Sequence, residues 1–273
     1  MAERARRAAV LGRPIAHSLS PLLHRAAYTE LGLDWSYEAI DTDVAGLPAV
    51  LAERSDWAGF SCTMPLKRAA LEVAAQVRPT AAAIGAANTL LPRDGGGWIA
   101  ENTDVTGVVA AVREVTPRLP TSATVLGAGG TAQAVVAALA ALGLRRCTLL
   151  VRDRARAGAA LVTADVLGVA VDLADLAVDA PELGADLVVS TLPAGVADRF
   201  AAARFTGAQS VLDVVYDPWP TALAAAAQRQ GATVLSGGLM LLHQAAAQVE
   251  LMTGRPAPIE AMRAALRGVR PEV

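Results

Sequence analysis

A short apolar run followed by an apolar stripe at helical spacing marks the segment around which the chain is organised. The run 123–126 predicts a buried strand that ends at Gly127. Beyond it, apolar residues recur at intervals of three and four, at Ala132, Val135, Val136, Leu139 and Leu142. This spacing predicts one face of a helix, and Gly143 suits its C-terminal end. We therefore expect a strand, a glycine turn and a helix in succession.

The turn carries small residues at the spacing of a dinucleotide-binding motif, Gly127-Ala128-Gly129-Gly130-Thr131-Ala132. Gly127 permits a tight turn, Gly129 lets a pyrophosphate approach the main chain, and Ala132 lets the helix pack closely on the strand. The unpaired N–H groups at the helix N-terminus would face the phosphates. A turn of small residues without a ligand is the alternative, and the strand–turn–helix context favours the dinucleotide site.

Further apolar runs follow downstream and alternate with helical stretches rich in Ala and Leu. These runs are 148–151, 169–172, 185–190, 210–214 and 232–235. Strands that alternate with helices are typical of a parallel sheet, so an α/β fold is expected. Before the glycine turn, the pattern predicts strands at 8–11 and 35–39 and helices at 47–52 and 104–115, with one more helix after Pro65.

Composition excludes several classes of function. The 273 residues leave room for one large or two modest domains. With 24 basic and 26 acidic residues, the net charge of −2 has no electrostatic footprint for nucleic acid. Two cysteines, Cys62 and Cys147, lie far apart and fit a reducing compartment. The three histidines match no metal-binding spacing, so no metal is expected.

Two apolar stretches resemble targeting or membrane segments at first sight. The stretch 8–12 is too short for the apolar region of a signal peptide. Residues 121–144 carry no charge, but the glycine turn inside them argues against a membrane span. We therefore expect a cytoplasmic protein that is not inserted in a membrane.

Two serines precede a predicted helix near the N-terminus. Ser20 before Pro21 suits an N-cap followed by a proline in the first helical turn. Ser18, two residues earlier, is not explained by capping. Paired hydroxyls at a helix N-terminus suit a carboxylate or another anion, and hydrogen bonding within the local turn is the alternative.

Lys67 is the only lysine in the chain, since the other 23 basic residues are arginines. An ammonium is compact and its pKa can be shifted, which a guanidinium does not offer. Lys67 is therefore a candidate for acid–base chemistry, and accidental retention of one lysine is the alternative. Asn88 and Asp104 lie at predicted element ends, where they would either cap a helix or bind hydroxyl groups in a polar pocket.

Taken together, the motifs of this chain resemble those of the shikimate dehydrogenase family, and the resemblance extends over nearly the whole length of the chain. The motifs that carry it, in family order and spacing, are Gly12-Arg13-Pro14-Ile15-Ala16-His17-Ser18-Leu19-Ser20-Pro21, Thr63-Met64-Pro65-Leu66-Lys67, Asn88-Thr89, Asn102-Thr103-Asp104-x-x-Gly107, the glycine turn, Asp213-Val214-Val215-Tyr216-Asp217-Pro218-Trp219-Pro220-Thr221 and Gly237-Gly238-Leu239-Met240-Leu241-Leu242-His243-Gln244.

The resemblance implies two α/β domains. Residues 1–104 would form the substrate-binding domain, completed by C-terminal helices within 238–273 that pack back on it. Residues 105–237 would form a Rossmann-like domain that binds NADP. The implied reaction is the reversible, NADPH-dependent reduction of 3-dehydroshikimate to shikimate, a step of aromatic amino-acid biosynthesis. A small-molecule substrate is thus the expected partner, and the resemblance leaves a monomer or a homodimer open.

The resemblance also implies roles for individual residues. Lys67 and Asp104 would act at the reacting carbon, and Ser18 and Ser20 would hold the substrate carboxylate. Thr63, Asn88, Asp104 and Gln244 would bind ring hydroxyls, with Tyr216 near the cleft between domains. The positions implied for the cofactor are Gly127, Ala128, Gly129, Gly130, Thr131, Arg152, Asp153, Arg156, Val214, Gly237 and Met240.

Several positions depart from the family pattern, and most of them concern the cofactor. They are Cys62, Val151, Asp153, Ser190-Thr191-Leu192-Pro193 and Ser236. Arginine after the second strand of a dinucleotide domain accepts a 2′-phosphate, whereas an acidic residue binds the ribose hydroxyls of NAD. Arg152 and Arg156 favour NADP, and Asp153 either repels the phosphate or pairs with a neighbouring arginine.

Two other functions remain open from the sequence. The nearer one is a quinate or aminoshikimate dehydrogenase of the same family, although serine at position 20 fits shikimate better. The more distant one is a non-catalytic NADP-binding regulatory protein, which the presence of both Lys67 and Asp104 disfavours.

Overall fold

The computed structural model describes residues 5–116 and 118–271, which form two compact units. The first unit comprises the chain up to Thr103 and from Leu241 onward, and the second unit is Asp104–Met240. The sequence placed the corresponding boundaries after residues 104 and 237. Each unit is an α/β structure built on its own six-stranded sheet, so the predicted fold class is confirmed.

The sheet of the first unit is mixed, with strand order β2-β1-β3-β5-β6-β4. Strands β1, β2 and β3 run parallel, whereas β3–β5 and β5–β6 pair antiparallel and β4 runs parallel to β6. The strands span Arg6–Gly12 (β1), Trp35–Asp41 (β2), Gly59–Cys62 (β3), Gln76–Val77 (β4), Thr89–Pro92 (β5) and Trp98–Glu101 (β6).

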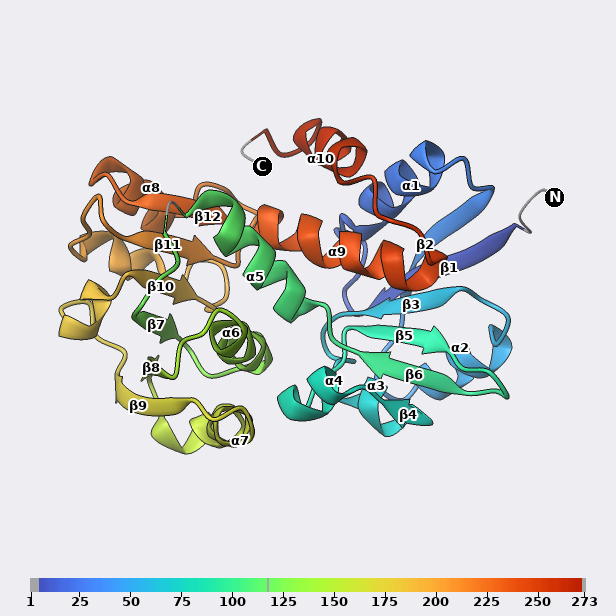
Figure 1. Cartoon of the computed structure of the whole chain (residues 1–273), viewed down its shortest axis with the longest axis horizontal. Helices are drawn as coiled ribbons and strands as arrows, with labels where there is room; N and C mark the ends of the chain where they lie inside the picture. Colours follow the sequence, from blue (N-terminus) through green and yellow to red (C-terminus); the bar gives the residue numbers. More distant parts are fainter. Residues whose placement is uncertain (1–4, 117, 272–273) are drawn as a thin grey trace. The chain divides into compact units, whose positions relative to one another are not determined.

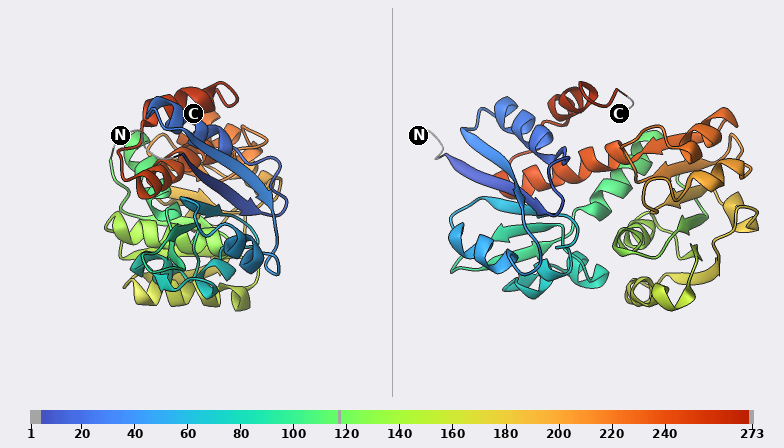
Figure 2. Two further views of the ribbon diagram at one scale, coloured as in Figure 1. Left: turned by 90° about the vertical axis from the view of Figure 1, so that its right-hand side faces the viewer. Right: turned by 180° about the vertical axis from the view of Figure 1, so that it is seen from behind.

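Helices cover both faces of this sheet. They are α1 (Ser20–Glu30), α2 (Leu47–Glu53), α3 (Ala69–Glu72), α4 (Pro79–Ile84), the part of α9 (Gly237–Thr253) from Leu241, and α10 (Ile259–Arg267). Figures 1 and 2 show α1 and α10 side by side, and the two helices are in contact. The C-terminal helices thus return to the N-terminal unit, as predicted.

Alternation along β3 shows how the two faces differ. Phe60 and Cys62 belong to an apolar core together with residues of α2, α3 and α4. Gly59 and Ser61 face the other side of the sheet, because successive side chains of a strand alternate between faces. Ser61 donates a hydrogen bond to Gln248 of α9, and a Cβ at Gly59 would contact Met252 of the same helix. One face is therefore apolar, and the face toward α9 carries buried polar groups.

The sheet of the second unit is entirely parallel, with order β12-β11-β10-β7-β8-β9. Counted from β7, this is the strand order 3-2-1-4-5-6 of the doubly wound dinucleotide fold. The strands span Ala123–Leu126 (β7), Arg146–Val151 (β8), Ala170–Asp175 (β9), Leu187–Ser190 (β10), Ser210–Asp213 (β11) and Thr233–Ser236 (β12).

The helices of the second unit complete the alternation that the sequence predicts. They are α5 (Asp104–Val115), α6 (Gly130–Ala141), η1 (Arg154–Ala157), α7 (Gly158–Val166), η2 (Pro181–Gly184), η3 (Asp198–Ala202) and α8 (Ala222–Arg229), with the first residues of α9. Every residue of the predicted apolar stripe, from Ala132 to Leu142, is buried. Gly143 follows α6 with φ +94°, as expected of the residue that ends a helix.

Two local predictions are wrong. Ser20 is the first residue of α1 and not its cap, because Leu19 occupies the capping position with helical backbone angles. No helix begins directly after Pro65, since residues 64–68 form a turn and α3 starts at Ala69.

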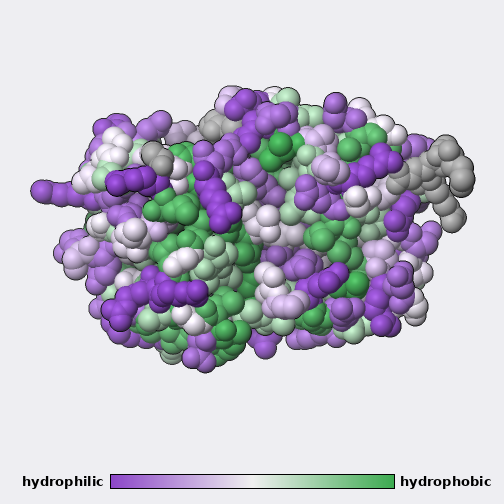
Figure 3. Space-filling view, viewed as in Figure 1, coloured by the Kyte–Doolittle hydropathy of each residue, from purple (hydrophilic) through white to green (hydrophobic). Residues whose placement is uncertain are grey.

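The surface is mixed in character. On the face shown in Figure 3, hydrophilic residues are interspersed with hydrophobic ones, which gather over the part of the second unit where α5 and α6 lie. Among the helices that the structure describes, none is both long and apolar enough to cross a membrane.

Candidate functional site

The site in the first unit begins where β1 and β3 end side by side. A Cβ at Gly12 would overlap the Thr63 side chain and the Met64 carbonyl oxygen, so only glycine lets the two segments meet this closely. The Arg13 N–H donates to the Met64 carbonyl at 3.0 Å, and the Thr63 N–H donates to the Leu11 carbonyl at 2.9 Å. The segments that carry Ser18 and Lys67 are therefore joined at their start.

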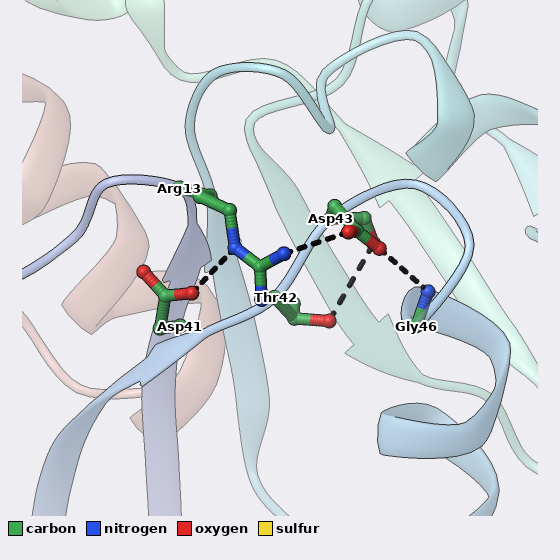
Figure 4. Close-up of polar contacts among 5 residues, drawn as sticks. All are labelled: Arg13, Asp41, Thr42, Asp43 and Gly46. Carbon is green, nitrogen blue, oxygen red and sulfur yellow. Dashed lines mark hydrogen bonds and ion pairs between the residues drawn. The ribbon is translucent and has the colours of Figure 1, made fainter.

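Arg13 ties the same segment to the end of β2. Figure 4 shows its guanidinium between two carboxylates: Nε donates to Asp41, and Nη1 donates to Asp43 at 2.7 Å. Asp43 also accepts from the Gly46 N–H at 3.0 Å. The Asp41 carboxylate raises the pKa of Arg13. Because all three charged side chains are about half exposed, we expect this cluster to order the loop more than to stabilise the fold.

Ser18 and Ser20 lie at the N-terminus of α1. The Ser18 hydroxyl accepts from the Ser20 N–H at 3.3 Å, which is the local turn interaction that the sequence left as an alternative. The Ser20 side chain is buried, and Ser18 is partly exposed. The capping residue itself, Leu19, makes no side-chain cap hydrogen bond. The N-terminus of α1 thus carries two hydroxyls, and the Ser18 hydroxyl already accepts from the first N–H of the helix.

Lys67 lies in the turn after β3, and a hydrogen bond to its main-chain carbonyl fixes the position of this turn. Its carbonyl accepts from the Ala87 N–H at 2.7 Å, so this turn lies directly beside the segment that leads to Asn88. The side chain is partly buried. Nearby Cys62 is fully buried, and burial raises the pKa of its thiol to about 12, against a small opposing effect of the Lys67 charge. Cys62 therefore stays a protonated thiol at neutral pH, which excludes it as a nucleophile.

Asn88 is the centre of the polar groups in this unit. Its Oδ1 accepts from the Thr103 N–H and the Thr89 hydroxyl, both at 2.8 Å. Its Nδ2 donates to the Thr103 hydroxyl at 2.9 Å and to Gln244 Oε1 at 3.3 Å. Asn88 is 2 % exposed and Gln244 7 %. Residues 156 positions apart in the chain thus meet as one amide pair.

Asp104 directly follows Thr103 and is the first residue of α5. Chain connectivity therefore places it beside the Asn88–Thr103 contact, although it belongs to the second unit. An acidic residue in the first turn of a helix is favourable because of the helix dipole.

In the second unit, the glycine turn lies at the point where the strand order reverses. Gly127 has φ +103°, and its N–H donates to the Leu150 carbonyl at 2.9 Å. A Cβ there would also crowd the Thr191 hydroxyl, so the turn requires glycine. Gly129 and Gly130 are exposed, and a Cβ on Gly129 would meet no atom within 4 Å. The N-terminus of α6 is thus open to an anion, as a pyrophosphate requires.

The basic segment after β8 has a defined arrangement. Asp153 caps η1, because its Oδ1 accepts from the Ala155 N–H at 3.0 Å. Arg154 pairs with Asp175 of β9 at 3.3 Å. Arg152 and Arg156 lie on either side, and both are exposed. The Asp153 carboxylate, which could have repelled a 2′-phosphate, therefore caps η1.

The loop from β11 to α8 is closed by a buried carboxylate, Asp213, which the sequence analysis did not single out. Its Oδ1 accepts from the Val215 N–H at 3.2 Å, and its Oδ2 accepts from the Thr221 hydroxyl at 2.8 Å. Thr221 also caps α8 by accepting from the Ala224 N–H. Asp213 thus fixes both ends of the loop that carries Tyr216.

Gly237 packs against the start of this loop. A Cβ at Gly237 would overlap the Val214 carbonyl, and the Gly237 N–H donates to the Val215 carbonyl at 3.3 Å. Met240 lies one turn further along α9 and is 8 % exposed. Val214, Gly237 and the loop of Tyr216 are therefore neighbours, whereas the segment of Arg152 follows a different strand of the sheet.

A doubly wound sheet with a glycine turn at its switch point, together with a second α/β unit that carries the only lysine and a pair of buried amides, is typical of a two-domain dinucleotide-dependent oxidoreductase. Comparison with known proteins gives the family. Residues 10–90 match the family model "Shikimate dehydrogenase substrate binding domain", and residues 239–267 match "Shikimate 5'-dehydrogenase C-terminal domain". Shikimate dehydrogenase (NADP(+)) of Methanothermobacter thermautotrophicus is 36 % identical over 275 residues, covering 95 % of each chain.

Solved structures agree over the same length. The crystal structure of Mycobacterium tuberculosis shikimate dehydrogenase has a TM-score of 0.88 and 45 % identity, covering 97 % of this chain and 99 % of that one. Shikimate 5-dehydrogenase from Thermus thermophilus, in complex with NADP(H) and shikimate, has a TM-score of 0.83 and 35 % identity, covering 96 % and 99 %. The chain belongs to the shikimate dehydrogenase family and is an NADP-dependent oxidoreductase.

The structure also contains site neighbours that the sequence analysis missed. Thr103 and Thr89 appear in the quoted motifs but were given no role, and both bond to the side chain of Asn88. The signal for Asp213 was a carboxylate at the end of an apolar strand. Its partner Thr221 lies eight residues away across a loop whose path the sequence does not reveal.

Asp213 generates a prediction about the pH dependence of stability. Burial raises its pKa above the ordinary value of 3.8, although the hydrogen bonds from Thr221 and Val215 oppose this shift. The folded protein then binds the proton more tightly than the unfolded chain does. The resulting stabilisation is complete below pH 3.8 and is lost as pH rises through the raised pKa.

We expect Asp213→Asn, which cannot ionise, to gain stability relative to the wild type as pH is raised from about 4 to about 7. The gain should not exceed about 1.4 kcal/mol per pH unit, the limit for one proton. Urea unfolding at several pH values measures it. Asp179→Asn, at an exposed position, is the control and should show a smaller change. A stability difference between Asp213→Asn and wild type that is constant with pH contradicts the prediction.

Proposed function

We propose that this enzyme catalyses the reversible reduction of 3-dehydroshikimate to shikimate with NADPH, and that Lys67 supplies the proton. The observation that carries the proposal is the arrangement within the first unit. The chain's only lysine lies in a turn hydrogen-bonded to the segment of Asn88, next to the segment that leads to Ser18, Ser20 and the start of α1. The second unit has the strand order and glycine turn of a dinucleotide fold.

We assign the substrate carboxylate to Ser18 and Ser20. Their hydroxyls lie at the N-terminus of α1, where the helix dipole favours a negative charge. Ring hydroxyls are assigned to Thr63, Asn88, Asp104 and Gln244, and Tyr216 is assigned to substrate binding near the cleft between domains. The buried, mutually bonded amides of Asn88 and Gln244 support this assignment, because they bring polar donors and acceptors together in a desolvated setting.

We assign proton transfer to the Lys67 ammonium. Reduction of a ketone leaves negative charge on its oxygen, and a positioned acid lowers the cost of that charge by donating a proton as it develops. In the reverse direction the neutral amine of Lys67 takes the hydroxyl proton. Asp104 is assigned as its orienting partner and as a hydroxyl acceptor.

The residues of the second unit fit NADP. The exposed glycines at the start of α6 leave room for a pyrophosphate, and Arg152 and Arg156 are exposed while Arg154 is paired with Asp175. The cofactor, when bound, supplies or accepts the hydride. We assign the 2′-phosphate to Arg152 and Arg156, the pyrophosphate to residues 127–131, and the nicotinamide end to Val214, Gly237 and Met240.

We further propose that the enzyme works in the cytoplasm on small molecules and binds no nucleic acid. Both cysteines are free and buried, which supports a reducing compartment, and the net charge of −2 supports the absence of a nucleic-acid partner. Quinate or aminoshikimate dehydrogenase activity and a non-catalytic NADP-binding role are the rival functions. An assay of nicotinamide reduction with shikimate and with quinate, each with NADP and NAD, separates all of these.

One prediction from this proposal concerns the substrate carboxylate and its assigned ligands, Ser18 and Ser20. Loss of a hydrogen bond to a charged group costs about 1.5–3 kcal/mol, so Ser18→Ala and Ser20→Ala should each raise KM for shikimate by roughly 10- to 150-fold. The effect on kcat should be smaller. Ser36→Ala, on an exposed position of β2, should leave KM unchanged. An unchanged KM in the double variant would reduce both serines to residues of the local turn.

The second prediction concerns Lys67. Lys67→Ala should lower kcat by about 10²–10⁴-fold with a smaller change in KM, the usual effect of losing a general acid. Lys67→Arg should also fail, because a guanidinium keeps its proton near neutral pH. Arg68→Ala removes an adjacent exposed cation and should retain activity. Near-full activity of Lys67→Arg would make Lys67 an electrostatic anchor only.

The third prediction concerns cofactor choice. The wild type should have a higher kcat/KM with NADP than with NAD, and Arg152→Ala and Arg156→Ala should each lower the NADP value by at least about tenfold. The NAD value should hardly change, because NAD has no 2′-phosphate. Arg154→Ala is the matched control, since its guanidinium already pairs with Asp175. Equal or better kcat/KM with NAD in the wild type would overturn the assignment.

A further inference from the structure

A hydrogen-bonded chain of buried polar side chains runs through the first unit from Tyr37 to Asn88. Gln248 of α9 lies at the centre of this series of side chains. Its Oε1 accepts from the Ser61 hydroxyl at 2.7 Å, and its Nε2 donates to the Asn88 carbonyl at 3.1 Å and to the Thr89 hydroxyl at 2.9 Å. Gln248 is 1 % exposed. One amide thus joins α9 to both β3 and the start of β5.

The direction of each hydrogen bond follows from groups that have only one role. The Asn88 carbonyl can only accept, so the amide nitrogen of Gln248 must face it, and its oxygen faces Ser61. The Thr89 hydroxyl accepts from Gln248 and therefore points its own hydrogen at Asn88 Oδ1, 2.8 Å away. The Thr103 N–H, which can only donate, reaches the same oxygen. Asn88 Nδ2 is thereby turned toward Gln244.

The far end of this chain is aromatic and uncharged. The Tyr37 hydroxyl donates to Ser61, and the ring of Tyr37 stacks on His24 with centroids 4.0 Å apart. His24 Nε2 lies 3.3 Å from Gln248 Oε1, and burial lowers the pKa of His24 to about 3. Burial also raises the pKa of Tyr37 well above its ordinary value. At neutral pH the chain therefore consists of neutral dipoles with fixed directions.

Gln248 follows Gln244 by one turn of α9, so the two side chains lie on one face of the helix. The bonds from Gln248 to Ser61, Thr89 and the Asn88 carbonyl fix the position of α9 along the strands. That position in turn sets Gln244 Oε1 against Asn88 Nδ2. An apolar side chain of similar length would fill the same space without fixing either amide.

We propose that Gln248 is a positioning residue for substrate binding, which fixes the mutual orientation of the Asn88 and Gln244 amides, the groups proposed to bind ring hydroxyls, through Thr89 and α9. This inference rests on the proposed role of Asn88 and Gln244. Gln248 itself is not proposed to touch substrate. The consequence is a specific kinetic defect when Gln248 loses its hydrogen bonds while its volume is kept.

The test uses the full-length enzyme with Gln248→Met and Thr89→Val, which keep volume and remove hydrogen bonds. Each should lower kcat/KM for shikimate by about three- to tenfold, mostly through KM, with KM for NADP unchanged. The double variant should lose less than the product of the two single losses, because both break one path to Asn88. Thr89→Ser, which keeps the hydroxyl, should restore the wild-type KM.

A structural role alone would give a different result. Thr124→Val is the matched control: Thr124 is 1 % exposed in the second unit, and its hydroxyl donates to the Glu182 carbonyl at 2.6 Å. It should lower Tm without changing KM for shikimate. If Gln248→Met and Thr89→Val behave in the same way, with Tm lowered and KM unchanged, the inference is overturned.

Two further measurements separate this inference from the proposed function. Wild-type turnover of shikimate with NADP tests the reaction by itself, before any variant is made. Asn88→Ala tests the role of Asn88: a raised KM there with an unchanged KM in Gln248→Met overturns the positioning role alone. An unchanged KM in Asn88→Ala overturns both assignments. A larger loss with shikimate than with an analogue lacking a ring hydroxyl, in Gln248→Met, supports the inference.

Discussion

The candidate sites of the two units each depend on main chains that approach each other at the carboxyl ends of parallel strands. At Gly12 the approach is to the turn of Thr63 and Met64, and at Gly237 it is to the carbonyl of Val214. Any side chain at either position would have to push a strand end or a loop away. Because parallel strands end at one edge of a sheet, these contacts gather loops from distant parts of the sequence there. The polar residues on those loops then become neighbours.

The buried polar groups near these close contacts differ in charge between the two units. In the first unit the buried polar groups around Asn88 are amides and hydroxyls, and the charged side chains of Arg13, Asp41 and Asp43 lie about half exposed. In the second unit a buried carboxylate, Asp213, is held by Thr221 and by the Val215 N–H. Neutral dipoles keep their directions over the whole neutral pH range. A buried carboxylate, by contrast, makes the stability of its loop depend on pH.

Much of this arrangement could be predicted from the sequence, because it depends on local pattern. The predicted helix 104–115 and strand 123–126 agree with α5 and β7, since apolar periodicity and the glycine turn define them within a few residues. Ser20 was predicted wrongly because Leu19 adopts helical backbone angles that a capping rule does not consider. Gln248 offered only a weak signal, a glutamine on an otherwise mostly apolar helix. Its partners on β3 and β5 lie more than 150 residues away and are fixed by tertiary packing alone.

The division of the first unit between two chain segments has a consequence for biosynthesis. Ser61, Thr89 and Asn88 are made early, whereas Gln244 and Gln248 follow only after the second unit, Asp104–Met240, has been translated. At about 5–20 residues per second, that interval lasts roughly 7 to 27 seconds. During it, the face of the nascent sheet that carries Ser61 has no helix α9 to cover it. In a chain that stalls on the ribosome before Leu241, the Ser61 and Thr89 hydroxyls and the Asn88 amide would therefore hydrogen-bond to water in place of Gln248 and Gln244.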